Sequence, residues 1–291
     1  MIYRVTHSTK YQYKRQVSIA EHAVCLWPRS FSGHHCYWHA LEIIPAPSSQ
    51  HDRVDYFGNR ITLFTIQKDH RELVVRSRSE VDVGAEARPW PEGTLAWERV
   101  RQALPEDRSP EGLDAYQFVF ESPRIRPSPE FAAYAIQSFE PERSLGEALL
   151  DLTERIHLDF RFDSKATEVT TPPEEVFRKR RGVCQDFAHV QIACLRSLGL
   201  AARYVSGYLR TYPPPGRARL IGADASHAWV SVYSIDGGWL EVDPTNNVKP
   251  SNGHITIGWG RDYSDVPPVR GVVLGGGEHT IKVAVDMEAT V

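Results

Sequence analysis

The chain has 291 residues, 41% of them hydrophobic, which is enough for two domains with buried cores. Its formal net charge of −3 is close to balance, so nothing in the composition indicates nucleic acid or an anionic membrane as a partner. Four cysteines are too few for a disulfide scaffold in a chain of this length. We therefore expect a reduced, cytoplasmic protein, although an oxidising compartment could bridge Cys25 and Cys36.

The first part of the chain shows the alternation of apolar and polar residues that is typical of β-strands. No uninterrupted apolar segment follows the first residues, so we expect neither a signal peptide nor a membrane span. Strands are predicted at residues 2–6, 17–27, 37–44, 54–57, 60–66 and 72–83, with turn signals between them. Their spacing predicts an N-terminal β-sandwich-like domain over residues 1–84, which packs against the rest or shapes one wall of a cleft.

A histidine-rich run at residues 34–39 raises the alternative of a metal site. The run contains His34, His35, Cys36 and His39. These residues do not have the spacing of zinc ligands in helices or knuckles, and neighbouring residues of a strand point to opposite faces. We interpret the run as part of a strand, and we expect the protein to need no metal ion and no other cofactor.

Between residues 85 and 164 the pattern changes to helical segments separated by proline and glycine. Helices are predicted at residues 94–104, 110–120, 128–139 and 145–158. Ser128 followed by Pro129 is typical of a helix start. In the last segment, apolar residues at helical spacing predict one buried face: Leu145, Leu149, Leu152 and Ile156. This region is predicted to be a helical layer that connects the first domain to a third unit, residues 165–291.

A further short helix is predicted to start near Thr170 and to end at Gly182. Its last part is the basic run of residues 178–181, which we interpret as a solvated helix end, favourable beside the last carbonyl groups. The alternative is that the run attracts an acidic substrate, because Cys184 follows it immediately.

Cys184 is predicted to lie in the first turn of a new helix. Residues 181–183 break the preceding element, and an apolar stripe then begins: Phe187, Val190, Cys194 and Leu198. Gly199 is the predicted end of this helix. In the first turn, unpaired backbone amides and the helix dipole favour the thiolate, the nucleophilic form of cysteine. Cys194 lies within the stripe and is interpreted as a small buried hydrophobe.

His227 and Asp243 can complete the chemistry that a nucleophilic cysteine needs. The histidine belongs to a strand pattern whose other face is wholly apolar, so its imidazole is expected to point toward a cleft. A turn at residues 236–238 is expected to bring the next strand back beside the first one. That turn would place Asp243 within reach of the imidazole, where a carboxylate fixes the tautomer and stabilises the imidazolium.

Four residues near these motifs have two interpretations each. Asp224 either caps a turn or competes with Asp243 as the orienting carboxylate, and we favour Asp243. His189 is either a helix histidine with satisfied partners or a residue that supports the site from behind. Trp229 and Trp239 are interpreted as core residues rather than as platforms for a substrate.

The remaining segments of the third unit are predicted to be a loop and two strands. Residues 212–216 are rich in proline and predict a stiff surface loop that could form a rim. Residues 254–257 and 280–286 have the strand pattern and are expected to finish the sheet, with a glycine turn at residues 275–277 between them.

The motifs of the second half of the chain resemble those of the bacterial transglutaminase-like proteins. They are, in chain order, residues 182–189, 195–208, 224–229, 243–246 and 260–266. The resemblance covers most of residues 165–290, and the β-rich start is similar to the N-terminal region that accompanies this core. It implies an α+β fold with a papain-like core, in which a helix that bears the cysteine packs on an antiparallel sheet. It also implies Cys184 as nucleophile, His227 as acid and base, and Asp243 as orienting residue.

These residues and the resemblance predict a cysteine-dependent acyl-transfer enzyme that acts on peptide or side-chain amides through a thioester. Hydrolysis would make it a peptidase or amidase, and transfer to an amine would make it a transglutaminase. We favour hydrolysis, because transfer needs a water-excluding acceptor tunnel that no pattern indicates. The expected partners are a peptide or protein substrate and, for transfer, a small amine. The alternative from another class is a non-catalytic binding module on the same scaffold.

Overall fold

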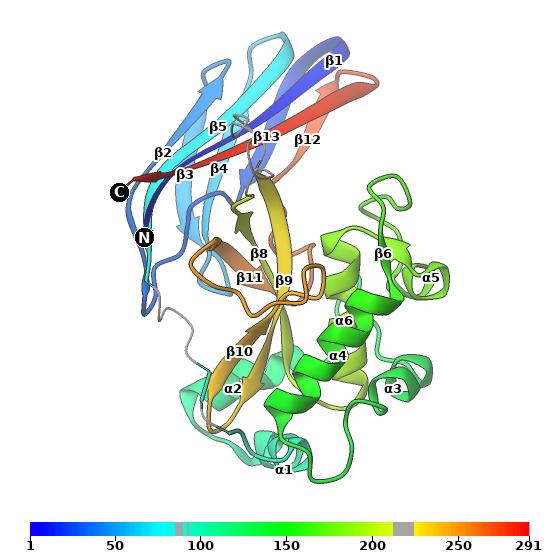
Figure 1. Cartoon of the computed structure of the whole chain (residues 1–291). Helices are drawn as coiled ribbons and strands as arrows, with labels where there is room; N and C mark the ends of the chain where they lie inside the picture. The colour runs from blue at the N-terminus through cyan, green and yellow to red at the C-terminus, as the bar shows by residue number, and fades with distance from the viewer. Residues whose placement is uncertain (85–89, 92, 212–223, 291) are drawn as a thin grey trace, which may run out of the picture.

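The computed structural model describes residues 1–84, 90–91, 93–211 and 224–290. Figure 1 shows a β-rich part at one end of the molecule and a smaller sheet with helices beside it at the other. The loop expected at residues 212–216 lies outside the described residues. Among the helices of the described ranges, none is both long and apolar enough to cross a bilayer.

The β-rich part is a seven-stranded antiparallel sheet around one long strand, β1 (Ile2–Val24). The first half of β1 pairs with β5 and β13, and its second half pairs with β4 and β12. The sheet therefore curls, and it encloses a core of its own that includes Val17, Phe64 and Leu73. Its other strands are β2 (His34–Ile44), β3 (Ser49–Val54), β4 (Arg60–Ile66), β5 (His70–Val83), β12 (Val269–Gly275) and β13 (His279–Thr290).

Two strand predictions in this part are wrong. Residues 2–6 and 17–27 were expected as separate strands, but β1 is continuous because the intervening Tyr11 and Tyr13 also pair with β13. Of residues 54–57, only Val54 belongs to a strand, as the last residue of β3. The chain then turns, and the Asp55 carboxylate accepts hydrogen bonds from the backbone amides of Phe57 (2.9 Å) and Asn59 (2.7 Å).

The last two strands of the chain lie in the first sheet, not in the second. The register pairs Ile2 with Thr290 and Tyr13 with His279, so β13 runs along the first half of β1. The expected unit of residues 165–291 therefore lacks its last two strands, and the unit of residues 1–84 is incomplete without them. A strand has the same periodicity in either sheet. The sequence of residues 280–286 alone therefore does not reveal which sheet this strand joins.

The helical layer follows the N-terminal strands. Its elements are α1 (Trp97–Ala103), η1 (Leu104–Glu106), α2 (Pro110–Tyr116), η2 (Gln117–Val119), α3 (Pro129–Ala135) and α4 (Leu145–Asp159). The predicted cap of α3 is confirmed, because the Ser128 hydroxyl accepts a hydrogen bond from the Phe131 amide (3.4 Å). The predicted face of α4 is completely buried: Leu145, Leu149, Leu152 and Ile156. Burial of such a side chain stabilises a fold by roughly 1.5–3 kcal/mol.

The basic run is less solvated than expected. The helix α5 (Pro173–Lys179) ends at Arg180, which has a left-handed backbone with φ of 52°. The Arg180 guanidinium lies 4.0 Å from the ring centre of Phe177 and 4.6 Å from that of Phe160. Arg180 therefore packs on the aromatic cluster as a cation–π partner, whereas Arg178 and Lys179 are exposed.

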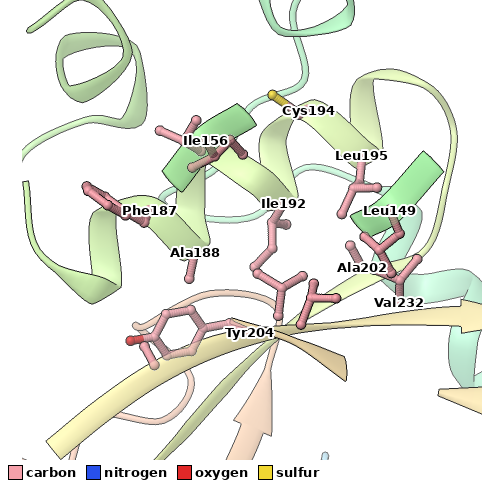
Figure 2. Packing of buried hydrophobic residues seen from close by; sticks show 14 of the residues in the cluster. Leu149, Ile156, Phe187, Ala188, Ile192, Cys194, Leu195, Ala202, Tyr204 and Val232 are labelled. Carbon is pink, nitrogen blue, oxygen red and sulfur yellow. The ribbon is translucent and has the colours of Figure 1, made fainter. Parts of the chain in front are cut away.

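The second sheet has the strand order β10-β9-β8-β11 and carries the helix α6 (Cys184–Ser197) on one face. Its strands are β8 (Ala202–Leu209), β9 (Ala225–Ser234), β10 (Gly238–Val242) and β11 (His254–Gly260). Figure 2 shows Ala188 and Ile192 of α6 above Tyr204 of β8 and Val232 of β9. The apolar face predicted for β9 is thus the face that packs on α6.

The start of α6 at Cys184 confirms the predicted helix boundary, but the predicted apolar stripe is too narrow. Every residue from Gln185 to Arg196 is buried. The reason is that α3, α4 and α5 contact α6 in addition to the sheet. A helix enclosed in this way has no solvent-facing side, so a one-sided pattern underestimates its burial.

Gly207 in β8 is a position of close approach within the second sheet. It pairs with His227 of β9 on one side and with Thr256 of β11 on the other. A β-carbon at Gly207 would overlap the carbonyl oxygen of Ile255 and the ring of Trp229. The missing side chain therefore leaves room for the Trp229 ring to extend across β8 toward β11.

We expect Gly207→Ala to destabilise the protein by about 3 kcal/mol, because the added methyl group cannot avoid the Ile255 backbone. Urea unfolding measures the effect. Gly253→Ala is the matched control, since a β-carbon there meets no atom within 4 Å. Equal stability of the two variants would contradict the close approach described for Gly207.

Candidate active site

Cys184 is held at the start of α6 by a capping arrangement around Asp186. The Asp186 carboxylate accepts hydrogen bonds from the Val183 amide (2.8 Å) and the Thr167 hydroxyl (2.5 Å). Gly182 is needed in front of this cap, because a β-carbon there would lie 2.5 Å from an Asp186 oxygen. Cys184 itself is only half-buried, unlike Cys194 in the middle of the helix. The thiol is therefore fixed at a helix N-terminus and still accessible.

His227 links the thiol to a carboxylate. Its Nε2 atom lies 2.7 Å from Oδ2 of Asp243, and the Cys184 side chain lies near enough to raise the pKa of the imidazole. Because Nε2 donates to the carboxylate, Nδ1 is the ring nitrogen left for the thiol. His227 and Asp243 are 7% and 0% exposed, so water does not compete for the bond between them. The structure thus brings together the three residues expected from the sequence.

Asp243 lies just after β10, where the chain turns and forms a bridge with Val248. Its Oδ1 atom accepts hydrogen bonds from the amides of Thr245 (3.0 Å) and Asn246 (3.3 Å). Its Oδ2 atom accepts from the Asn246 side chain (2.7 Å) as well as from His227. Both oxygens of the carboxylate therefore have hydrogen-bond donors before any substrate binds.

The electrostatics of the His227–Asp243 pair favour the charged form of both residues. Burial by itself lowers the pKa of His227, but hydrogen bonds to Asp243 and Cys184 and the negative charges of both raise it from 6.5 to about 10. Burial by itself raises the pKa of Asp243, but hydrogen bonds from His227, His254 and Asn246 lower it well below 3.8. The arrangement can therefore hold a protonated imidazole beside the Asp243 carboxylate near neutral pH.

Asp224, the alternative orienting carboxylate, lies elsewhere. Its Oδ1 atom accepts a hydrogen bond from the Thr211 amide (2.7 Å), and its Oδ2 atom accepts one from the Met287 amide (2.6 Å). Asp224 therefore ties the entrance of β9 to the C-terminal strand β13. Only the fold reveals this contact between segments that are distant in the sequence.

His189, Trp229 and Trp239 contact other residues of the fold. The Nε2 atom of His189 accepts a hydrogen bond from the Tyr263 amide (3.2 Å), and burial lowers the pKa of this imidazole, so that it is neutral. The Trp229 indole is fully buried and donates to Glu241 (2.9 Å). The Arg203 guanidinium lies 3.9 Å from the ring centre of Trp239. Trp229 is therefore a core residue as expected, whereas Trp239 is only partly buried at the edge of a smaller core cluster.

Asn246 and His254 also contact the site, although neither was predicted as a site residue from the sequence. Asn246 follows Asp243 in the same turn, so its position in the motif was a usable signal. The Nε2 atom of His254 lies 3.3 Å from Oδ2 of Asp243, although His254 belongs to β11. Only the strand order β10-β9-β8-β11 brings His254 to the site, and a linear pattern does not contain that order.

His227, Asp243 and His254 offer potential metal-ligand atoms that lie within 4.8 Å of one another. A site with two histidines and one carboxylate is chemically suited to a transition metal. In this protein, however, the same atoms form hydrogen bonds between matched donors and acceptors. We therefore assign the group to a hydrogen-bond network. His34, from the other suspected metal run, bonds to the Arg29 carbonyl (2.7 Å) and the Thr256 amide (3.1 Å).

Fold and site together define a papain-like α+β protein, in which an imidazole is hydrogen-bonded to a carboxylate and lies close to a thiol. Residues 3–82 match the bacterial transglutaminase-like N-terminal region, and residues 132–244 match the transglutaminase-like superfamily. An uncharacterized protein from Mycobacterium tuberculosis is 42% identical over 98% of this chain and 92% of its own length. The chain belongs to the transglutaminase-like superfamily.

Two further comparisons concern fold and core. The crystal structure of a candidate cysteine protease from Cytophaga hutchinsonii superimposes with a TM-score of 0.77 at 20% identity, covering 100% of this chain and 92% of that one. This likeness extends to the whole fold. A protein-glutamine gamma-glutamyltransferase from Pseudomonas aeruginosa is 31% identical over 115 residues, which are 39% of this chain and 17% of the transferase.

Proposed function

We propose that the protein is a cysteine-dependent enzyme that cleaves peptide or side-chain amide bonds through a thioester. The observation that carries this proposal is His227, which is hydrogen-bonded to Asp243 and lies close enough to Cys184 for the thiol to raise the pKa of the imidazole. In the first step the Cys184 thiolate attacks the amide carbonyl carbon, and a C–S bond forms. The oxyanion that results lies near the first amides of α6, where the Cys184 N–H is a natural donor.

The second step expels the amine. The C–N bond breaks as the His227 imidazolium gives its proton to the leaving nitrogen, which leaves a thioester on Cys184 and a neutral imidazole. In the third step this imidazole takes a proton from water, and the hydroxide attacks the thioester carbon. The C–S bond then breaks, which releases a carboxylic acid and restores the thiolate–imidazolium pair.

Hydrolysis is the branch that the geometry supports best. Cys184 is half-buried rather than enclosed, so a thioester on it would be open to water. Transfer to an amine requires that water be kept away from the thioester. The similarity of the core to a protein-glutamine gamma-glutamyltransferase favours transfer as the second candidate function.

The two branches are separated by their products. Glutamine-containing peptides are incubated with the protein, with and without an excess of a primary amine, and the products are weighed by mass spectrometry. We expect conversion of the amide to the acid whether or not the amine is present. Amine-dependent adducts with little acid would contradict hydrolysis and support transfer. An unreactive Cys184 together with unchanged peptides would support the binding module instead.

A further inference from the structure

His254 reaches the site from a strand that is not adjacent to the strand of His227. The strand β8 lies between β11 and β9, where its Leu209 pairs with His254 and its Gly207 pairs with His227. Since Gly207 has no side chain, the Trp229 ring can extend over it and meet His254. The ring centres of His254 and His227 are 6.1 Å apart, and the Asp243 carboxylate is hydrogen-bonded to both imidazoles.

The hydrogen bonds of His254 determine which of its nitrogens carries a proton. The Nδ1 atom accepts a hydrogen bond from the Ser251 backbone amide (3.3 Å), so Nδ1 has no proton of its own. In the neutral ring the proton is then on Nε2, which points to Oδ2 of Asp243 at 3.3 Å. His254 is therefore a donor to the same carboxylate oxygen that receives the His227 proton.

The ring of His254 is also fixed by packing. It meets the Trp229 ring edge to face, with ring centres 5.3 Å apart and planes at 83°. The Trp229 indole is itself held by its hydrogen bond to Glu241, and His254 is only 3% exposed. A ring in this position has both nitrogens occupied and no route to a substrate, so it acts on the reaction only through Asp243.

We propose that His254 is a positioning residue, whose Nε2–H holds the Asp243 carboxylate in the orientation that aligns His227 with Cys184. The inference rests on the proposed function for its catalytic consequence, but the alignment itself is a property of the folded protein. Asp243 Oδ2 then has three side-chain donors, from His227, His254 and Asn246, which together leave it one position. Loss of one donor allows the carboxylate to rotate away from the imidazole.

Two substitutions separate hydrogen bonding from packing. His254→Gln places an amide N–H near the position of Nε2 and keeps the donor, whereas His254→Phe keeps a ring against Trp229 and removes the donor. We expect His254→Phe to lower kcat about 10- to 100-fold with KM nearly unchanged, because His254 does not touch the substrate. His254→Gln is expected to retain kcat within about threefold of the native protein. Equal losses in both variants would mean that packing alone matters and would overturn the proposal.

Nitrogen-15 NMR of the imidazoles tests the alignment without any turnover. In the native protein we expect His254 in the Nε2–H tautomer and a hydrogen-bonded Nε2–H signal from His227. That His227 signal should be retained in His254→Gln and shifted or broadened in His254→Phe. An Nδ1–H tautomer of native His254, or a His227 signal unchanged by His254→Phe, would overturn the proposal. Because this readout requires no substrate, it is separate from a failure of the proposed hydrolysis.

Discussion

Cys184→Ala is expected to abolish thioester formation and to lower the rate of amide cleavage by about 10⁴-fold or more, because no other group in the site can form the acyl intermediate. The fold should survive the change, since Cys184 is half-buried and its place at the start of α6 depends on the Asp186 cap. Mass spectrometry of the protein after brief exposure to substrate shows the acyl adduct, and product formation gives the rate.

Cys36→Ala is the matched control for this experiment. Cys36 is also half-buried, but it lies in β2 of the first sheet, and burial raises the pKa of its thiol to about 11. We expect this variant to retain both the adduct and the rate. A Cys184→Ala protein that still cleaves amides at a native rate would refute the nucleophile assignment.

His227→Ala is expected to slow the alkylation of Cys184 by iodoacetamide about 100-fold at pH 6. In the native protein the raised pKa of His227 keeps the imidazole protonated up to about pH 10, and a positive charge beside a thiol favours its thiolate form. Without that partner the thiol should react like a free cysteine, whose pKa of about 8.5 leaves very little thiolate at pH 6. Peptide mass mapping after timed labelling, repeated from pH 5 to pH 9, measures the difference.

The pH dependence of stability provides the control for this variant. The folded-state pKa of His227 is above the unfolded value of 6.5, so its protonation stabilises the native protein fully below pH 6.5. That contribution is lost as the pH rises through about 10. The stability difference between native protein and His227→Ala should therefore shrink as the pH rises from 6.5 to about 10.

The labelling experiment can also contradict the Cys184–His227 pair. A labelling profile that His227→Ala leaves unchanged would show Cys184 to be an ordinary thiol.

The three residues of the candidate site could be located from the sequence because each lies at a marked boundary. Cys184 follows a break and begins an apolar helical pattern, His227 lies in an alternating strand, and Asp243 ends the next strand after a glycine turn. Local patterns of this kind survive in any fold that uses the segment. They identify the elements and the ends of elements where side chains meet.

Two features of the fold could not be predicted from local sequence patterns. The first is pairing between distant strands: β13 has the same periodicity whether it joins β1 or β11, and only the coordinates show the register with β1. The second is a contact across an intervening strand. His254 reaches Asp243 from the far side of β8, and Gly207 leaves space there for the Trp229 ring that packs on His254. A single glycine in a strand does not reveal which side chain uses that space.

The pairing of β1 with β13 has a consequence for how the chain acquires its structure during synthesis. Residues 2–13 leave the ribosome long before their partners at residues 279–290. In the first sheet, one side of β1 therefore stays unpaired while the helical layer and the second sheet are synthesised. Such a long separation makes closure of the sheet a late and slow event. The open edge of β1 is the part of the nascent chain most in need of protection from aggregation.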